Sequence, residues 1–429
     1  MRFSLTVAFT LIAGAALAQQ AADAVQPEGS TTGIAVATTE AIAAAQEAKD
    51  AGQPVTAETY MVAAANPLAV QAGVEVLAKG GTAADALIAV QLVLGLVEPQ
   101  SSGLGGGAFL VWYDAETQEL TTLDGRETAP LAATPQLFQT EDGEPMGFFD
   151  AVVGGRSVGT PGTPALLEEA YLRWGSVAWS SLFEAAIDLA EDGFEVSPRL
   201  AAMIEGDAER LSTFPVTAEY FLPGGTPLAA GTTLKNQPYA DTLRLLAAEG
   251  ADAFYVGKIA QDIMAAVQFA PSNPGVLSEL DLAVYQVKER PPVCVTYRDH
   301  DVCGMGPPSS GALTVGQILG MLDSYDLAEL GAENPESWRL IGDASRLAFA
   351  DRGRFMADSD HVPMPTAGLV DPAYLEDRAA LLGAKRPCPR SHRAILRSIT
   401  AATGRMTKAS NCLQPRTFPS WTASATSPP

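Results

Sequence analysis

Residues 83–99 read AADALIAVQLVLGLVEP, a predicted helix that is apolar around almost its whole circumference. Such a helix is buried on most sides, so the fold must place other elements around it. Thr82 is a favourable N-cap for this helix. Another helix is predicted just before it, because Asn66 can cap its start, Pro67 suits the first helical position and Gly80 ends it. These two neighbouring helices begin the ordered part of the chain.

The remaining elements favour a layered α+β fold. Strands are predicted at 108–114 and 119–125, joined by a polar turn. Further helices are predicted at 163–174, 178–192, 197–211, 238–249, 252–268 and 335–355. Clusters of helices with separate strand pairs argue against a regular βαβ sheet. The chain also supplies few strands for a complete sandwiched sheet.

Cys294 and Cys303 flank VTYRDHDV, which predicts a hairpin that turns at residues 298–299. In that register the two thiols lie opposite each other, close enough for a disulfide. A metal site is the weaker interpretation, since the three histidines are scattered along the chain, and we expect neither a metal nor a cofactor. Cys388 and Cys412 receive no role.

The N-terminus is typical of an exported protein. Residues 1–18 contain a basic residue, a short apolar run and a small-residue ending, as in a cleavable signal peptide. Residues 19–56 are predicted as a poorly ordered leader. No later segment is apolar enough to span a bilayer. The net charge of −23 disfavours nucleic acid and anionic membranes as partners. We therefore expect a periplasmic or secreted protein, and export favours the disulfide.

The stretch SGLGGGAF fits a G-x-G-x-x-A fingerprint through Gly103, Gly105 and Ala108. A dinucleotide fingerprint follows a strand and opens a helix, whereas here a helix comes before the glycines and a strand after them. A phosphate cradle is therefore rejected. Two interpretations stay open: a tight turn that only glycine allows, or a glycine loop that shapes the floor of a pocket.

Arg126 and Glu127 follow the predicted strand 119–125 in TLDGRETAP. Arginine is suited to bidentate capture of a carboxylate. Taken alone, a surface arginine paired with its neighbouring glutamate is the simpler interpretation.

Three other groups of polar residues are candidates for a chemical role. GPPSSG, residues 306–311, offers two hydroxyls in a loop, although such loops are common turns. His300, His361 and His392 have no convincing serine and carboxylate partners, so a Ser-His-Asp hydrolase is not expected. Asp351 and Asp358 could pair as acids, but a solvated helix end is the favoured interpretation.

Taken together and in order, several of these stretches resemble the γ-glutamyltransferase family. They are MVAAANPLAVQAGVEVLAKGGTAADALIAV, EPQSSGLGGGAF, LDGRETAP, GTPGTPALLEEAYLRWG, MGPPSSG and ADRGRFMADSD. The resemblance runs from about Met61 to Ala384. One departure is Gly125, where many members carry an aromatic residue, which leaves the local packing around Arg126 open.

The resemblance implies an αββα sandwich of the N-terminal-nucleophile hydrolase type, here incomplete because only the large-subunit part is present. In that family the precursor cuts itself and exposes a threonine as the first residue of a small subunit. Arg126 would hold the α-carboxylate of a γ-glutamyl donor, with glutathione as the expected donor. The threonine would attack the γ-amide carbonyl, and water or an amine would then accept the glutamyl group.

The threonine motif is missing from this reading frame. The family's small subunit begins with a motif similar to Thr-Thr-His-x-Ser-Val-Val-Asp, whereas residues 385–429 hold eight Lys or Arg and no Asp or Glu. Read across codon boundaries, degenerate codons there permit TTHISVVDRFGNVT, and the single codon of Trp421 forces its aspartate. We therefore expect a change of reading frame near Ala384–Cys388. No catalytic nucleophile is assigned, and the chain by itself is predicted to be inactive.

The expected organisation is a signal peptide at 1–18, a leader at 19–56, a large-subunit-like domain at 57–384 and an aberrant, disordered basic tail at 385–429. A small subunit is the implied protein partner. Two other functions remain open: a related acylase that takes glutaryl or cephalosporin side chains, and a non-catalytic protein that binds glutamyl ligands.

Overall fold

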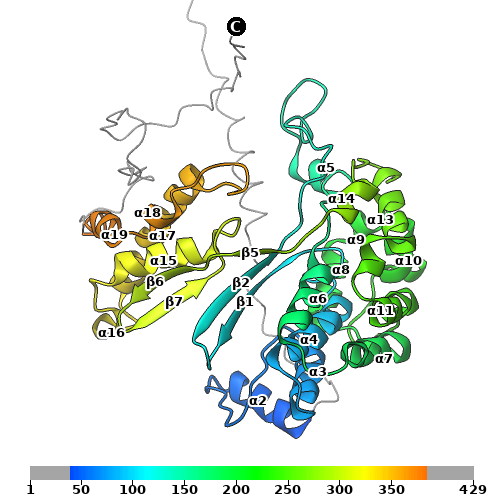
Figure 1. Ribbon diagram of the computed structural model, residues 1–429, viewed down its shortest axis with the longest axis horizontal. Coiled ribbons are helices and arrows are strands. Elements are labelled where there is room, and N and C mark those ends of the chain that lie inside the picture. The colour runs from blue at the N-terminus through cyan, green and yellow to red at the C-terminus, as the bar shows by residue number, and fades with distance from the viewer. Residues whose placement is uncertain (1–38, 384–429) are drawn as a thin grey trace, which may run out of the picture. The chain divides into compact units, whose positions relative to one another are not determined.

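The computed structural model describes residues 39–383 (Figure 1). The chain divides into two compact units. Among the described residues, the first contains 39–110 together with 123–288, and the second contains 111–122 together with 289–383. Within the described range, no helix is long and apolar enough to cross a membrane. The predicted signal peptide and basic tail lie outside the described residues.

The core of the first unit is built around α4 (Ala83–Val97), as its apolar sequence predicted. Thr82 and Asp85 form a capping box at its start, and α3 (Pro67–Ala78) comes before it with Asn66 as N-cap. Helix α4 contacts α3, α6 (Thr163–Trp174) and α7 (Glu184–Asp192). Its large, buried apolar side chains are Ile88, Leu92, Val93, Leu96 and Val97.

The unit contains further helices (Figure 1). They are α2 (Glu40–Asp50), α5 (Phe148–Val152), the 3₁₀ helix η1 (Trp179–Phe183), α8 (Pro198–Gly206), α9 (Ala208–Leu211), α10 (Pro215–Phe221), the 3₁₀ helix η2 (Pro223–Gly225), α11 (Gln237–Glu249), α12 (Asp252–Tyr255), α13 (Lys258–Gln268) and α14 (Glu279–Ala283).

Several of these elements differ from the prediction. The helix expected over 178–192 is divided into η1 and α7, and the one expected over 197–211 into α8 and α9. Residues 40–50 form α2 and not part of a poorly ordered leader, because Thr39 caps a run of good helix formers. The helix expected over 252–268 is divided into α12 and α13. Gly257, at φ +93°, lies between them in a conformation that a helix interior does not allow.

The strands form small sheets. Strands β1 (Ala108–Asp114), β2 (Glu119–Gly125) and β5 (Lys288–Arg290) make a three-stranded sheet in the order β1-β2-β5. In the first unit, β3 (Phe194–Glu195) pairs with β4 (Thr233–Leu234) in antiparallel fashion. Within the described residues the strands are thus few, as the sequence predicted.

The second unit contains the antiparallel hairpin of β6 (Val293–Tyr297) and β7 (His300–Gly304). Helix α15 (Gly311–Leu322) packs on this hairpin and also contacts α17 (Pro335–Phe355) and α19 (Pro372–Ala379). The shorter helices are α16 (Leu327–Leu330) and α18 (Thr366–Leu369). The prediction missed α15, because its first residues belong to a Pro, Gly and Ser-rich stretch that is typical of a loop.

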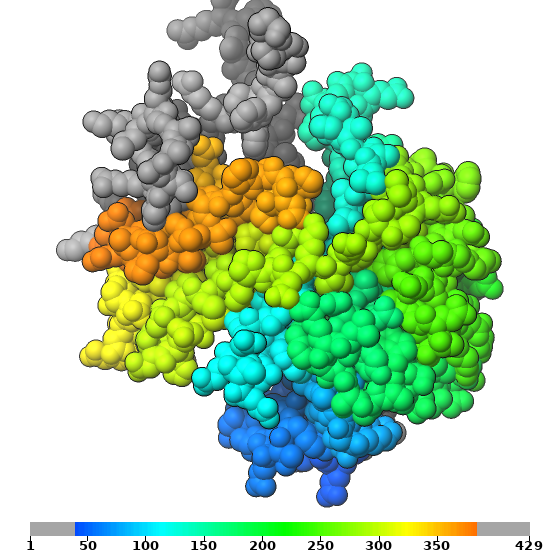
Figure 2. Space-filling model, viewed as in Figure 1, coloured from blue at the N-terminus to red at the C-terminus, as the bar shows by residue number. Residues whose placement is uncertain are grey.

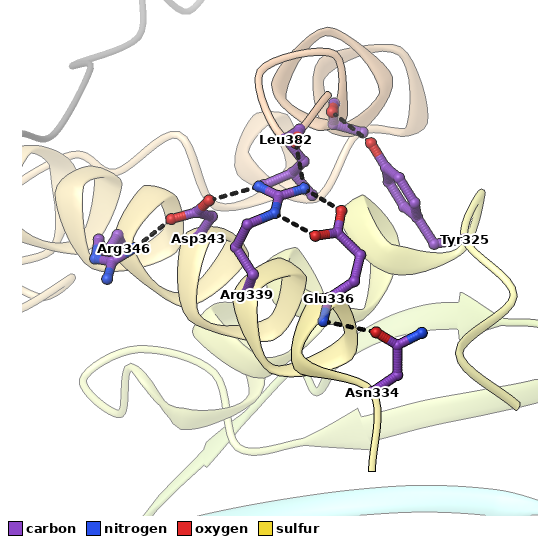
Figure 3. Close-up of polar contacts among 8 residues, drawn as sticks. Tyr325, Asn334, Glu336, Arg339, Asp343, Arg346 and Leu382 are labelled. Atoms are coloured by element: carbon purple, nitrogen blue, oxygen red, sulfur yellow. Dashed lines mark hydrogen bonds and ion pairs between the residues drawn. The ribbon is translucent and has the colours of Figure 1, made fainter. Parts of the chain in front are cut away.

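Arg339 links α17 to the end of the described chain (Figure 3). Its Nη2 donates to the carbonyl oxygen of Leu382 at 3.0 Å, just beyond α19. Its Nη1 and Nε donate to Asp343 at 2.9 Å and to Glu336 at 2.7 Å, respectively. The guanidinium is therefore oriented by two acids of its own helix while it caps a carbonyl of the following segment.

A segment of the first unit around α5 stands out from the neighbouring helices (Figures 1 and 2). Its base is held by Asn273, whose Nδ2 donates to the carbonyl oxygens of Asp150, Ala151 and Val153. Close to these hydrogen bonds, the main chains of Gly155 and Gly275 approach each other. A Cβ on Gly155 would lie 2.8 Å from the nitrogen of Gly275.

Candidate functional site

Arg126 lies immediately after the last residue of β2, where the sequence placed it. Its main chain is fixed by two side chains. The Arg126 N–H donates to Oδ1 of the buried Asp124 at 2.9 Å, which is an Asx-type turn. The Arg126 carbonyl oxygen accepts a hydrogen bond of 2.8 Å from the hydroxyl of Tyr285.

The side chain of Arg126, unlike its main chain, is not held by hydrogen bonds to the described residues. It is exposed, and within residues 39–383 its guanidinium forms no hydrogen bond or ion pair. The pairing with Glu127, which was the simpler interpretation of the sequence, is not formed among these residues. The strand end therefore presents the Arg126 guanidinium on a main chain that is held at both of its polar groups.

Gly107 explains why the strand end can lie so close to the glycine loop. A Cβ on Gly107 would lie 2.6 Å from the carbonyl oxygen of Gly125 and 2.8 Å from Cα of Arg126. Gly103 and Gly105, which made the fingerprint, have no atom within 4 Å of such a Cβ. The requirement for glycine therefore falls on a position that the fingerprint did not include.

The glycine loop also covers the start of α6. The carbonyl oxygen of Gly106 accepts the N–H groups of Gly162 at 2.9 Å and Thr163 at 3.1 Å. These are amide groups that a phosphate at a helix N-terminus would otherwise use. The loop lies between a helix and a strand, in agreement with the rejection of a dinucleotide site.

The departure at Gly125 has a local cause. A Cβ there would lie 2.6 Å from Cβ of Leu166 on α6. From the other side, a Cβ on Gly162 would lie 2.1 Å from the carbonyl oxygen of Gly125. In this chain, therefore, a larger residue before Arg126 would collide with the first turn of α6.

Two tyrosines of the site were missed by the sequence prediction. Tyr255 and Tyr285 stack with their ring centroids 5.7 Å apart and their planes within 2°. The Tyr255 hydroxyl donates to the carbonyl oxygen of Pro161 at 3.0 Å and accepts the N–H of Ala165 at 3.2 Å. Burial raises the pKa of both phenols, so both remain hydrogen-bond donors at neutral pH. No local motif marks either residue.

A buried carboxylate holds the beginning of the segment that leads to the glycine loop. Glu98 is only 3% exposed. Its Oε1 accepts from Asn66 Nδ2 at 2.9 Å and its Oε2 from Gln100 Nε2 at 2.6 Å, while Arg199 lies 3.5 Å away. The same Asn66 caps α3, so α3 and the segment after α4 are joined through one side chain.

The other predicted polar groups belong to the second unit. In the GPPSSG loop, Ser309 Oγ accepts the N–H of Gly311 at 3.2 Å, and Ser310 Oγ accepts from Arg352 Nε at 2.9 Å. Both hydroxyls are thus used at the start of α15. His300 and His361 are exposed, and His392 lies outside the described residues.

Cys294 and Cys303 occupy directly opposite positions of the β6–β7 hairpin, with their Cα atoms 4.1 Å apart and their sulfurs bonded. The hairpin turns at 298–299, with Arg298 at φ +56°. Among the described residues, no group of three or more His, Cys, Asp or Glu is arranged to hold a metal ion.

The interpretation of Asp351 as part of a solvated helix end was wrong. Asp351 is 1% exposed, and its carboxylate accepts from Arg378 at 3.0 Å, Tyr374 at 2.6 Å and Gln317 at 3.1 Å. Burial raises its pKa, against the effect of the Tyr374 hydroxyl and of Arg378. The error arose because Arg378 lies 27 residues away on α19. Asp358 is exposed, as expected.

Comparison with known proteins identifies the class. The family model for gamma-glutamyltranspeptidase matches residues 69–410, so the chain belongs to the gamma-glutamyltranspeptidase family. The match continues past Ala384, where the resemblance was predicted to end. Among solved structures, gamma-glutamyltranspeptidase of Helicobacter pylori aligns with a TM-score of 0.75 and 32% identity, over 78% of this chain and 95% of that one. The fold is accordingly that of the N-terminal-nucleophile hydrolases.

Particular relatives include two kinds of enzyme. The glutathione hydrolase proenzyme of Bacillus subtilis strain 168 is 38% identical over 322 residues, which is 75% of this chain and 54% of the relative. The Acylase ACY 1 proenzyme of Pseudomonas sp. strain SE83 is 36% identical over 327 residues, which is 75% of this chain and 58% of the relative. The chain thus spans about half the length of these curated relatives.

Proposed function

We propose that this chain carries the donor-binding part of a γ-glutamyltransferase, or glutathione hydrolase. The Arg126 guanidinium binds the α-carboxylate of a γ-glutamyl donor such as glutathione. One observation supports this most strongly. The N–H and the carbonyl oxygen of Arg126 are both hydrogen-bonded, whereas its guanidinium has no partner among residues 39–383. The family membership supplies the reaction.

In that reaction, the hydroxyl of a threonine at the start of a small subunit attacks the γ-amide carbonyl of the donor. Its own α-amine takes the hydroxyl proton and passes it to the leaving amine, while N–H groups stabilise the oxyanion. Water, or the amine of an amino acid or peptide, then releases the glutamyl group from the ester. No cofactor takes part. The Thr-Thr-His-x-Ser-Val-Val-Asp motif is not found in the reading frame given.

The 429-residue chain is therefore proposed to bind the donor without turning it over, and the small subunit is the partner that completes the site. The signal-like residues 1–18 support a periplasmic or secreted location. A change of reading frame near 384–388 accounts for the missing motif. An independent DNA sequence of the locus would contradict it if no frame contained TTHISVVD.

Donor binding is tested by calorimetric titration of the purified chain with L-glutamate and glutathione. Arg126→Ala should weaken binding by about 10- to 100-fold, since a hydrogen-bonded charge pair is lost. Arg126→Lys should fall in between, because lysine keeps the charge but not the bidentate geometry. The control is Arg354→Ala, at another exposed arginine. Equal affinity of Arg126→Ala and the unmodified chain would contradict the assignment.

Turnover is tested separately with a γ-glutamyl anilide. The purified chain should release no aniline above the uncatalysed rate, and measurable release would show that the proposed inactivity is wrong.

The acylase relative supports a second candidate, a related acylase. Glutaryl or cephalosporin side chains are the proposed substrates of this candidate. Glutarate carries a carboxylate but no α-amine, so equal binding of glutarate and glutamate would favour this candidate. A non-catalytic glutamyl-binding protein is a third candidate. Selective binding of glutamate, together with an ordered segment at 385–429, would favour it.

A further inference from the structure

The position of Arg126 depends on a residue far away in the sequence. Beyond Gly125 the strand β2 has ended, so ladder hydrogen bonds no longer set the orientation of the next peptide. The local bond from the Arg126 N–H to Asp124 fixes one side of that residue. The other side is fixed by Tyr285, 159 residues later, through the bond to the Arg126 carbonyl oxygen.

Tyr285 is itself held in place. Its ring lies parallel to that of Tyr255, which is 8% exposed and is bonded through its hydroxyl to the main chain around the start of α6. The Tyr285 hydroxyl also lies against Gly162, where a Cβ would approach it to 2.1 Å. The hydroxyl is thus confined between the Arg126 carbonyl and the turn before α6.

This confinement bears on the guanidinium through the main chain of Arg126. The orientation of the peptide between residues 126 and 127 sets the ψ angle of Arg126 and hence the rotamers that its side chain can adopt. A bidentate pair with a carboxylate needs the guanidinium plane in a narrow range of directions. A change in the orientation of this peptide would therefore weaken the binding of a charged carboxylate more than the binding of a neutral group.

We propose that Tyr285 is a positioning residue for carboxylate recognition at Arg126, supported from behind by Tyr255. The proposal rests on the proposed function, in which Arg126 binds the donor's α-carboxylate. Tyr285 is not expected to touch the donor. It makes the site selective for an α-carboxylate over an α-amide by orienting the main chain from which the guanidinium extends.

The test compares L-glutamate with its α-amide, isoglutamine, in calorimetric titrations of the full chain. Tyr285→Phe removes only the hydroxyl and keeps the stacked ring. It should weaken glutamate binding about five- to tenfold, the effect of losing one hydrogen bond, and leave isoglutamine binding nearly unchanged. The preference for the carboxylate should fall by the same factor. Equal weakening of both ligands would indicate a merely structural role and overturn the proposal.

Tyr239→Phe is a matched control in the same unit. The Tyr239 hydroxyl also donates to a main-chain carbonyl, that of Leu92, at 2.8 Å, and the side chain is half-buried. This variant should lose a comparable part of its stability but keep the preference for glutamate. A fall in preference in Tyr239→Phe equal to that in Tyr285→Phe would also overturn the proposal.

Hydrogen exchange separates failure of this proposal from failure of the proposed function. In Tyr285→Phe, the amides of residues 126–128 should exchange faster than in the unmodified chain. If the unmodified chain shows no preference for glutamate, the proposed function fails at Arg126, and carboxylate selectivity fails with it. Faster exchange in Tyr285→Phe would then still support the role of Tyr285 in orienting the main chain at residues 126–128. Unchanged exchange would contradict that role as well.

Discussion

Gly107 and Gly125 approach each other so closely that a Cβ on Gly107 would lie 2.6 Å from the carbonyl oxygen of Gly125. Gly107→Ala should therefore force the strand end carrying Arg126 to move, since the colliding atoms are main-chain atoms. We expect a loss of about 1–3 kcal/mol in the free energy of unfolding, together with weaker glutamate binding. Gly105→Ala is the control, as nothing lies within 4 Å of its Cβ. Urea unfolding measures the stability of both variants, and equal midpoints would contradict the prediction.

The second prediction concerns the buried pair of Asp351 and Arg378. Asp351→Asn keeps the size of the side chain but removes the negative charge that accepts a hydrogen bond of 3.0 Å from Arg378, which is 3% exposed. Breaking one partner of a buried pair should cost about 3–5 kcal/mol. Asp358→Asn, seven positions later and exposed, should change stability by less than about 0.5 kcal/mol. Thermal unfolding of both variants would show whether the two costs differ.

The third prediction concerns Cys294 and Cys303. Alkylation in denaturant should modify neither residue without reductant and both after reduction, as detected by mass spectrometry. With a sequence separation of 9, removal of the bond by Cys294→Ala and Cys303→Ala together should cost about 2–3 kcal/mol, because a short loop is no longer closed in the unfolded chain. Alkylation of either cysteine in the unreduced protein would contradict the bond.

The fourth prediction concerns pH and joins α7 to α11. Hydrogen bonds from Arg244, at 2.8 Å, and from Gln237, at 3.2 Å, lower the pKa of Glu191 to about 2 from its usual value of 4.5. Because the pKa is lower in the folded chain, this contribution to stability is present above pH 4.5 and disappears as the pH falls towards 2. The pair is exposed, so the effect is small and weakens in salt.

Carboxyl NMR titration measures this pKa directly. Arg244→Ala should return the pKa of Glu191 towards 4.5. In Glu191→Gln, the unfolding midpoint should no longer change with pH through the titration of this residue. A Glu191 pKa that is the same with and without Arg244 would rule out the guanidinium as the cause.

The sequence predicted best the elements whose ends carry their own signals. The helices α3, α4, α6 and α17 and the strands β1 and β2 have the predicted bounds within a residue or two. Each of these helices begins with an N-cap residue or with proline in its first turn. The prediction failed where one residue overrides a good pattern, as Gly257 does, and where a helix starts inside a loop-like composition, as α15 does.

The candidate site was predicted only in part, for a physical reason. Arg126 could be found because a strand end and an arginine are adjacent in the sequence. Tyr285, which donates to its carbonyl oxygen, and Tyr255, which stacks on Tyr285, lie more than a hundred positions away and carry no local signature. The burial of Asp351 was missed for the same reason, because its counter-charge belongs to another helix. Position 107 shows most directly why sequence alone was insufficient. It requires glycine because the main chain of Gly125 lies against it, and not because of its own turn.

The way in which Arg126 is held also bears on how such a protein can evolve. Asp124 and Tyr285 bind the N–H and the carbonyl of residue 126, groups that every amino acid except proline possesses. The location of this residue is therefore independent of its side chain. A single codon change at position 126 can offer a ligand a different chemical group at the same point in space, without any compensating change elsewhere. Under the proposed function, a different side chain at residue 126 would therefore keep both main-chain bonds, whereas loss of the Tyr285 hydroxyl would remove one of the two supports on which every such variant depends.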